Sequence, residues 1–142
     1  MSSFEVLIND KPIINGAILP FNQSQQNPVI KFKRSINDNY TIIVVDPDAP
    51  SRENPINKYW LHLLVINNNN KIVKYQKPEP PIGSGNHRYQ FYLLKQKNVL
   101  DKNNLRLHMD NNKVKREKFD FDEFVKDNNL KIIDSVYFET SR

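Results

Sequence analysis

Short apolar runs recur along the chain and are separated by polar turns, a pattern typical of β-strands. Their length and spacing favour a mainly β fold, an antiparallel β-sandwich with one or two short peripheral helices. No internal repeat, linker or change of composition divides the sequence, so residues 1–142 are expected to form a single domain. The expected strands are Phe4–Ile8, Val29–Lys33, Tyr40–Val45, Trp60–Asn67, Lys71–Tyr75, Tyr89–Leu94, Leu105–Met109 and Ile132–Glu139.

Two local signals refine this picture. Asn67–Asn70 predicts a hairpin turn, because asparagine tolerates the left-handed backbone region, although the run also fits a general bias toward Asn and Lys. One short helix is expected to begin at Asp120, which has capping-box spacing to Glu123. The apolar residues Phe121 and Phe124 then share one face of that helix.

Two carboxylates follow directly on one of the apolar strands. Asp46 and Asp48 belong to a run with two prolines, and prolines end a strand by removing backbone donors and fixing φ. Both side chains should therefore emerge on a stiff corner at the edge of the sheet, where ligand sites are often built. The alternative is a polar turn whose Asp side chains cap their own backbone.

Two other segments place histidine beside aromatic residues. The strand that begins at Trp60 is apolar on both faces, and strand alternation puts Trp60, His62 and Leu64 on one side. Farther along, a turn rich in proline and glycine leads into a strand on which His87 and Tyr89 share a face. One pocket would explain the carboxylate pair and both aromatic pairs.

Such a pocket would suit a phosphate group. Neutral imidazoles and a phenol offer donors, and the Gly83–Arg88 turn can direct successive backbone N–H groups inward as an anion-binding nest. An Asp that accepts a hydrogen bond from one imidazole nitrogen would leave the other nitrogen facing the ligand. For Asp48, binding to backbone or to arginine is the alternative.

Three motifs, DPDAPSR from Asp46, WLHLLV from Trp60 and PPxGxGxHRYxFxL from Pro80, occur in this order and spacing. With them the sequence resembles the phosphatidylethanolamine-binding protein family, which includes the Raf kinase inhibitor proteins and the plant flowering regulators. The late helix and the strand after it are also similar to the family. The resemblance covers nearly the whole chain, and Lys95–Lys118 matches poorly.

The resemblance implies a large central antiparallel sheet against a smaller one, and a pocket that takes phosphorylated headgroups or small anions but no long acyl chains. In the family, Trp60 corresponds to an aromatic gate and Pro81 and Gly83 to the pocket rim. Arg52 and Arg88 are expected to form salt bridges that hold the loops. The ligand-binding residues carried over are Asp46, Asp48, Ala49, Pro50, Trp60, His62, Pro81, Gly83, His87 and Tyr89.

The chain also departs from the family. Some members cover part of the pocket with an additional C-terminal helix, whereas this sequence ends at Arg142 just after its last expected strand. A more open pocket mouth is therefore expected. Lys95–Lys118, the segment that diverges most, often selects the protein partner in such families, so the identity of the partner is not carried over.

Composition adds limits of its own. The sequence contains no cysteine, which excludes disulfides, thiolate zinc sites and thiol catalysis. The N-terminus lacks the basic and apolar regions of a signal peptide, and no apolar run is long enough to cross a membrane. We therefore expect a complete, soluble, cytoplasmic protein, with a monomer as the default.

The positive charge is concentrated in one segment. Lys95–Lys118 holds eight Lys and Arg against three Asp and Glu, and the rest of the chain holds thirteen against thirteen, so this segment carries the whole formal charge of +5. Lys113–Lys118 within it suits an anionic membrane surface, an acidic protein or nuclear localisation, or is simply a solvated loop. Nucleic-acid binding is disfavoured because no aromatic residue interrupts the segment to stack on bases.

Three classes of function fit these residues. The first is a non-enzymatic binding module without a cofactor, which takes a phosphorylated headgroup or small anion and regulates a kinase or protease. The second is a hydrolase with His62 or His87 as general base and Asp46 as its orienting partner, although Ser84 lacks the Gly-x-Ser-x-Gly elbow of a nucleophile. The third is a metal site of His62, His87 and Asp46, whose spacing is not typical of metal ligands.

Overall fold

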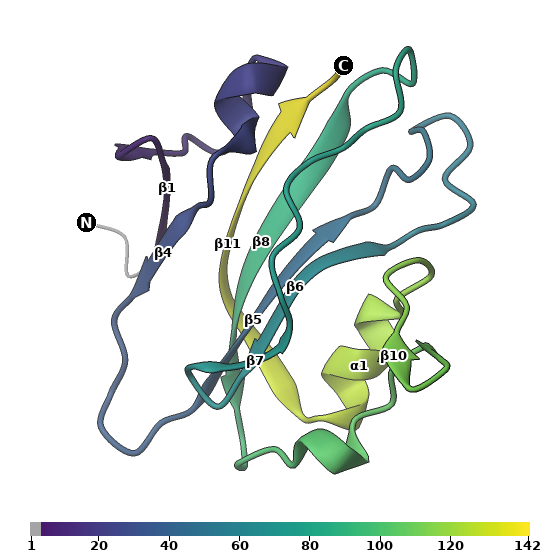
Figure 1. The fold of residues 1–142 in the computed structure, drawn as a ribbon. Coiled ribbons are helices and arrows are strands. Elements are labelled where there is room, and N and C mark those ends of the chain that lie inside the picture. The colour runs from purple at the N-terminus through teal and green to yellow at the C-terminus, as the bar shows by residue number, and fades with distance from the viewer. Residues whose placement is uncertain (1–3) are drawn as a thin grey trace.

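The chain forms one large sheet with a smaller sheet on one face and a helix on the other (Figure 1). A computed structural model describes residues 4–142, so Met1–Ser3, part of the expected domain and of the N-terminus examined for a signal peptide, lie outside it. In that described part, no helix is long and apolar enough to cross a membrane.

The large sheet has six strands in the order β3-β11-β8-β5-β6-β7, and the smaller sheet has the order β2-β1-β4. In the large sheet, β3 (Ala17–Ile18), β11 (Leu130–Thr140), β8 (His87–Gln96), β5 (Tyr40–Asp46), β6 (Trp60–Ile66) and β7 (Asn70–Val73) are the strands. The smaller sheet contains β2 (Lys11–Pro12), β1 (Phe4–Ile8) and β4 (Val29–Phe32), and β9 (Met109–Asp110) pairs with β10 (Lys113–Val114). The helices are α1 (Phe121–Asp127) and the 3-10 turns η1 (Phe21–Gln25) and η2 (Lys102–Asn104).

The prediction of a mainly β fold with a large and a smaller sheet is confirmed. The pairing is antiparallel except between β3 and β11, which run parallel and make the large sheet mixed. The expected strand Leu105–Met109 is wrong. Only its last residue belongs to a strand, and Leu105 and Leu107 pack irregularly against the core beside α1, so their alternation reflects burial without a neighbouring strand.

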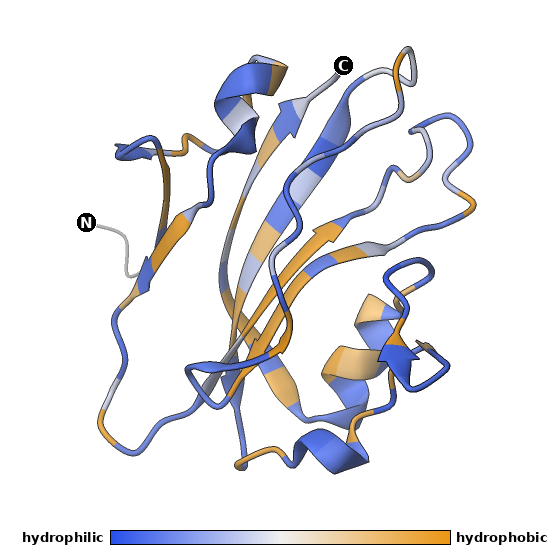
Figure 2. Ribbon diagram, viewed as in Figure 1, coloured by the Kyte–Doolittle hydropathy of each residue, from blue (hydrophilic) through white to orange (hydrophobic). Residues whose placement is uncertain are grey.

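The central strands β5 and β6 of the large sheet are almost entirely buried on both faces, as their nearly continuous apolar runs indicated, and Figure 2 shows these strands mostly in the colour of hydrophobic residues. Along β5, Ile42 and Val44 belong to a cluster beneath the smaller sheet, whereas Ile43 and Val45 belong to a cluster beneath α1. The site described below continues the first cluster toward the end of the sheet at which β5 ends, because Tyr89 of that cluster also lines the site.

Both local signals are confirmed. At the hairpin between β6 and β7, Asn67 and Asn68 have φ angles of 52° and 72°, values that asparagine adopts more readily than most residues. At the start of α1, Asp120 Oδ1 accepts a hydrogen bond from the backbone N–H of Glu123 at 3.1 Å. The apolar face of α1 then closes the second cluster through its buried phenylalanines.

Candidate functional site

Antiparallel pairing brings the three motifs to one end of the large sheet. β5 lies between β6 and β8, so its C-terminal end meets the N-terminal ends of both neighbours. The register pairs Asp46 with Trp60, and it pairs Val45 with Gln90, close to His87 at the start of β8. The loops after β5 and before β8 leave the sheet at this same end (Figure 1).

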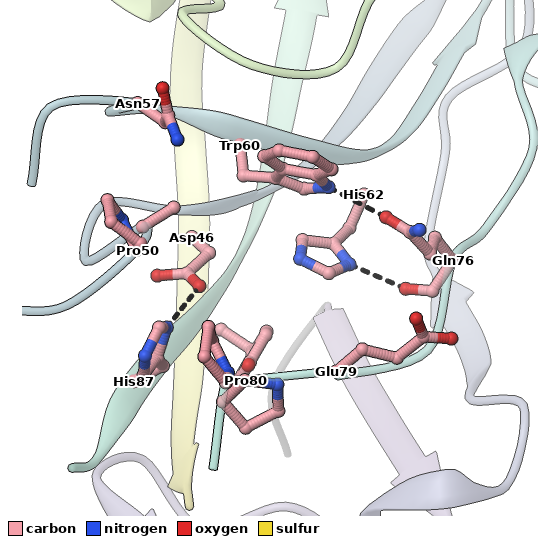
Figure 3. A pocket seen from close by; sticks show the side chains of 12 residues that line it. Asp46, Pro50, Asn57, Trp60, His62, Gln76, Glu79, Pro80 and His87 are labelled. Carbon is pink, nitrogen blue, oxygen red and sulfur yellow. Dashed lines mark hydrogen bonds and ion pairs between the residues drawn. The ribbon is translucent and has the colours of Figure 1, made fainter. Parts of the chain in front are cut away.

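These loops and strand ends surround a cavity of about 350 Å³. This volume is near the lower limit of roughly 300 Å³ for pockets that hold small molecules. Eight of the ten residues expected at the ligand site line the cavity, whereas Asp48 and Gly83 do not. The lining consists of Asp46, Ala49, Pro50, Asn57, Trp60, His62, Gln76, Glu79, Pro80, Pro81, His87 and Tyr89 (Figure 3).

A β-bulge in β6 determines which side chains face the cavity. The pairing of β5 with β6 shifts between Leu63 and Leu61, which leaves His62 as the extra residue. Trp60 and His62 both line the cavity, but Leu64 joins Leu61 in the cluster on the opposite face. The prediction that Leu64 shares a face with His62 is therefore wrong, because simple alternation fails across a bulge.

Asp46 and His87 form a buried pair in the cavity wall (Figure 3). His87 Nδ1 donates to Asp46 Oδ2 at 2.7 Å, and the two residues are only 1% and 4% exposed. Asp46 Oδ1 also accepts the backbone N–H of Asp48 at 2.7 Å. The other nitrogen of His87 lies 2.9 Å from Ser84 Oγ and so has a partner within the protein, and its expected approach to a ligand stays a prediction.

His62 presents a lone pair to the cavity. Its Nδ1 lies 2.6 Å from the backbone carbonyl of Gln76, and because a carbonyl only accepts, Nδ1 carries the proton. Burial lowers the pKa of His62 to about 4, so the ring is neutral near pH 7. Nε2 is then an acceptor, and Figure 3 shows it on the side of the ring that faces Asp46.

The ring of Tyr89 contacts the imidazole rings of both His62 and His87. Its ring centroid lies 5.2 Å from that of His62 in an edge-on arrangement and 6.4 Å from that of His87 in a stacked one. It also stacks on Phe138 of β11 at 5.3 Å. Burial raises the pKa of Tyr89, so the phenol remains protonated and able to donate.

Gln76 holds the opposite wall and was not expected at the site. Its Oε1 accepts from Trp60 Nε1 at 2.7 Å (Figure 3), and its backbone N–H donates to the carbonyl of His62 at 2.9 Å. The pairing of β6 with β7, extended past Val73, places Gln76 beside His62, and this was the only indication of Gln76 that the hairpin offered. Asn57, Glu79 and Pro80 were missed as well, and only Pro80 belongs to one of the three motifs.

Asp48 stabilises the loops instead of lining the cavity. It accepts the backbone N–H of Arg88 at 2.9 Å and its guanidinium at 3.0 and 2.8 Å. Arg52 reaches Asp48 at 3.4 Å and Glu139 at 2.9 Å, so the predicted salt bridges of Arg52 and Arg88 are confirmed. Burial alone would raise the pKa of Asp48, but the hydrogen bonds and charge of Arg88 hold it below its usual value.

Gly83 belongs to the turn before β8 but lies outside the lining. Its backbone N–H donates to the carbonyl of Arg142 at 3.1 Å, and that of Ser84 donates to the carbonyl of Pro81 at 3.0 Å. The N–H of Arg88 is bound to Asp48. The predicted anion-binding nest is therefore wrong for these three groups, because the protein itself accepts their hydrogen bonds.

The residues of the alternative metal site, His62, His87 and Asp46, do not form a cluster of the required kind. Within residues 4–142, no group of three or more His, Asp or Glu side chains is arranged to hold a metal ion. Asp46 and His87 instead form a hydrogen bond with each other, between Oδ2 and Nδ1.

Comparison with known proteins identifies the family. The sequence model of the phosphatidylethanolamine-binding protein family matches residues 9–138. The chain is 50% identical over 141 residues to phosphatidylethanolamine-binding protein homolog R644 of Acanthamoeba polyphaga mimivirus, covering 99% of both chains. It is 32% identical over 103 residues to MOTHER of FT and TFL1 homolog 2 of Oryza sativa subsp. japonica, covering 67% of this chain and 58% of the relative.

Solved structures share the fold. The carboxypeptidase Y inhibitor, crystallised with its cognate proteinase, aligns with a TM-score of 0.79 and 23% identity over 97% of this chain and 82% of its own. The phosphatidylethanolamine-binding protein of Plasmodium vivax aligns with a TM-score of 0.76 and 22% identity over 98% of this chain and 85% of its own. From the family match and the full-length relative together, this chain belongs to the phosphatidylethanolamine-binding protein family.

Proposed function

We propose that this chain is a non-enzymatic binding protein whose cavity takes a small phosphorylated headgroup or a similar small anion, and which regulates a protein partner such as a protease or kinase. The family is one of binding and regulatory proteins. One relative of the same fold was crystallised with the proteinase that it inhibits, which supports a protein partner of this kind.

The observation that carries the proposal is the convergence of polar side chains from distant segments on one cavity. Asp46, His62 and His87 are all buried, and they belong to three different strands. Burying polar groups costs desolvation even when they are paired, and these groups border a cavity, so selection for a ligand explains their presence better than selection for stability. A cavity of about 350 Å³ admits a headgroup but leaves no room for acyl chains.

Donors for phosphate oxygens are available in the lining. The Asn57 carboxamide and the Tyr89 hydroxyl both belong to it, and each has an N–H or O–H to offer. Pro50 and Pro81 add stiff apolar wall, which excludes water from a bound headgroup.

Trp60 provides the experiment, because it is the only tryptophan and it lines the cavity. Titration with phosphoethanolamine and with inorganic phosphate should change its fluorescence and raise the melting temperature. Tyr89→Phe removes only a hydroxyl and should weaken binding about tenfold, as expected for a hydrogen bond to a charged group. The matched control Tyr137→Phe removes a hydroxyl outside the lining and should bind normally. No response to either ligand at millimolar concentration contradicts the proposal.

Partner regulation is tested separately. Carboxypeptidase Y is the first proteinase to assay, because the structure that aligns at a TM-score of 0.79 is its inhibitor. The proposal predicts dose-dependent inhibition of a protease or kinase that phosphoethanolamine alters. If inhibition occurs without any effect of the ligand, the cavity and the partner surface are independent.

Hydrolysis is the second candidate, and one observation favours it. Ser84 Oγ, His87 Nε2, His87 Nδ1 and Asp46 Oδ2 form a continuous series with contacts of 2.9 and 2.7 Å, the order of a nucleophile, a base and an orienting carboxylate. However, Ser84 is absent from the cavity lining, and its hydroxyl donates to the carbonyl of Pro81 at 2.6 Å.

A fluorophosphonate probe decides between the two. Labelling that disappears in Ser84→Ala and is accompanied by ester turnover would establish the hydrolase. Without labelling, Ser84 is a structural support for the His87 ring.

A further inference from the structure

The end of the large sheet opposite the cavity carries exposed aliphatic side chains on two loops. Residues 33–39 lead into the start of β5, and residues 97–101 follow the end of β8, so both loops leave the sheet at this end (Figure 1). Ile36 is 90% exposed and Val99 is 71% exposed. Because β5 is seven residues long, this end lies roughly 20 Å from the cavity. A partner bound here would leave the cavity free.

Hydrogen bonds on both sides of Val99 fix its loop. On one side, the buried Gln96 donates from Nε2 to the carbonyl of Asn98 at 3.0 Å. On the other side, the backbone N–H of Leu100 donates to Asn67 Oδ1 at 3.0 Å, and Asn67 Nδ2 donates to the carbonyl of Leu100 at 2.8 Å. The exposure of Val99 is therefore built into the fold and is not the property of a loose loop.

Ile36 occupies the corner of a tight turn. The backbone N–H of Asp38 donates to the carbonyl of Ser35 at 3.1 Å, and Asn37, the third residue of the turn, has a φ of 71°. The turn is attached to the β6–β7 hairpin, because the carbonyl of Asp38 accepts from Asn68 Nδ2 at 3.2 Å. A side chain at such a corner has no neighbour to pack against, so Ile36 projects into water.

Cations without an acidic partner accompany both aliphatic residues. The two loops contain two carboxylates, and the protein itself uses both of them. Asp38 lies 3.6 Å from Lys95, and Asp101 accepts the backbone N–H of Asn103 at 3.0 Å. Within residues 4–142, the cations of this end that form no ion pair are Lys33, Arg34, Lys97 and Lys102. Exposed aliphatic tips and an excess of positive charge therefore coincide here.

We propose that this end of the molecule, with Ile36, Val99 and these four cations, is a docking surface for an anionic membrane. Two aliphatic side chains on separate loop tips can each enter the interfacial layer of a bilayer, and the negative surface of the bilayer attracts Lys and Arg. An acidic protein would explain the cations but not the aliphatic tips, which form no contiguous apolar patch. In this orientation the cavity faces away from the membrane and stays open to a partner in solution.

Sedimentation with vesicles of phosphatidylcholine, with or without phosphatidylserine, tests the proposal. The protein should bind only the vesicles with phosphatidylserine, and less tightly as the salt concentration rises. Ile36→Ser combined with Val99→Ser should weaken this binding about tenfold, because both side chains lose their apolar contact with lipid. The matched control is Ile56→Ser combined with Ile82→Ser, exposed isoleucines of loops at the cavity end, and it should bind like the wild type. All four positions are exposed, so both pairs should keep the wild-type melting temperature.

Two further measurements separate charge from orientation. Lys33→Gln combined with Lys97→Gln should weaken vesicle binding by about fivefold for each charge removed. The chain contains no cysteine, so a single introduced cysteine can carry a polarity-sensitive fluorophore. The label on Val99→Cys should shift its emission to the blue with phosphatidylserine vesicles, and the label on Ile82→Cys should not.

Three results would overturn the proposal. The first is no binding to phosphatidylserine vesicles at low salt. The second is a loss of binding in the Ile56→Ser and Ile82→Ser pair or a blue shift at Ile82→Cys, because the cavity end would then be the one that docks. The third is salt-sensitive binding that the Ile36→Ser and Val99→Ser pair does not weaken, which would leave an acidic protein as the better partner. None of them bears on the ligand of the cavity, which the Trp60 titration tests separately.

Discussion

The cavity end of the large sheet and the basic segment Lys95–Lys118 treat charge in opposite ways. At the cavity end, the carboxylates of Asp46 and Asp48 are buried and each is paired with a specific cation or imidazole. In the basic segment, Lys115 lies 3.3 and 3.8 Å from carboxylates on a surface open to water. A buried charged group needs a specific hydrogen-bond or ion-pair partner in the folded protein, because it has lost its contact with water. An exposed charged group is stabilised by water, so its position does not indicate what it binds.

Arg116 is the exception within the basic segment. Its guanidinium donates to the backbone carbonyls of Leu61, His62 and Lys74 at 3.0, 3.3 and 2.9 Å. Because these carbonyls belong to the bulged strand and the segment after β7, Arg116 fastens the basic segment beside the strand that carries His62. One cation of a segment expected to be a solvated loop therefore has a structural role.

The largest contrast should appear when one carboxylate is removed from each region. Asp48→Ala leaves the backbone N–H of Arg88 without its acceptor and breaks an ion pair between a buried carboxylate and a guanidinium that is 38% exposed, which should lower the free energy of unfolding by about 2 to 3 kcal/mol. Asp110→Ala removes a carboxylate that is 57% exposed, and it should change the same quantity by less than about 0.5 kcal/mol. Urea unfolding measures both. Similar losses in the free energy of unfolding for the two variants would show that buried and exposed carboxylates contribute alike, contrary to the contrast between the two regions.

Acid should distinguish the buried His62 from the exposed His108. His62 has a folded-state pKa of about 4, below its ordinary value of 6.5, so the unfolded chain binds its proton first. Its contribution is complete above pH 6.5 and declines as the pH falls toward 4, by about 2 to 3 kcal/mol. His62→Gln should flatten this part of the pH profile, and His108→Gln, at an exposed position of the basic segment, should leave it unchanged. A wild-type profile that His62→Gln does not alter contradicts the assignment.

Arg116→Ala sharpens the comparison inside the basic segment. Loss of charge-assisted hydrogen bonds to three carbonyls should lower the free energy of unfolding by about 1.5 kcal/mol. Lys113→Ala, an exposed cation of the same segment, should have no measurable effect. If the two variants have the same free energy of unfolding, Arg116 contributes no more to stability than the exposed cations of the segment.

The smallest effect concerns the helix that follows the basic segment. Asp120→Ala removes the N-cap of α1 and should lower stability by about 1 kcal/mol. Asp122→Ala, two residues later in the first turn and without the capping bond, serves as the control. Equal losses in thermal unfolding would show that charge near the helix start matters more than the cap.

Much of the fold was predictable because burial leaves periodic signals. The runs Tyr40–Val45 and Trp60–Asn67 are mostly apolar, and both became central strands whose two faces are covered. Leu105–Met109 failed for the same reason that these succeeded, since burial against α1 also produces apolar positions but provides no neighbouring strand. Two-residue strands such as Lys11–Pro12 are too short to leave a pattern.

The sequence predicted the residues of the candidate site only where they belong to motifs that contain proline, glycine or histidine. Asp46, His62 and His87 belong to motifs, whereas Gln76 and Glu79 reach the lining through hairpin register and loop path. The bulge that separates Leu64 from His62 has no sequence signal here, and the N–H groups of the Gly83 turn are bound by residues far along the chain. Contact of the basic segment with an anionic membrane, and weak affinity for nucleic acid, stay predictions.

The most direct test of the account is a crystal structure of the protein soaked with phosphoethanolamine. We expect the headgroup inside the cavity, in contact with Tyr89 and His62. A headgroup bound elsewhere on the surface, or an empty cavity at a saturating concentration of ligand, would contradict it.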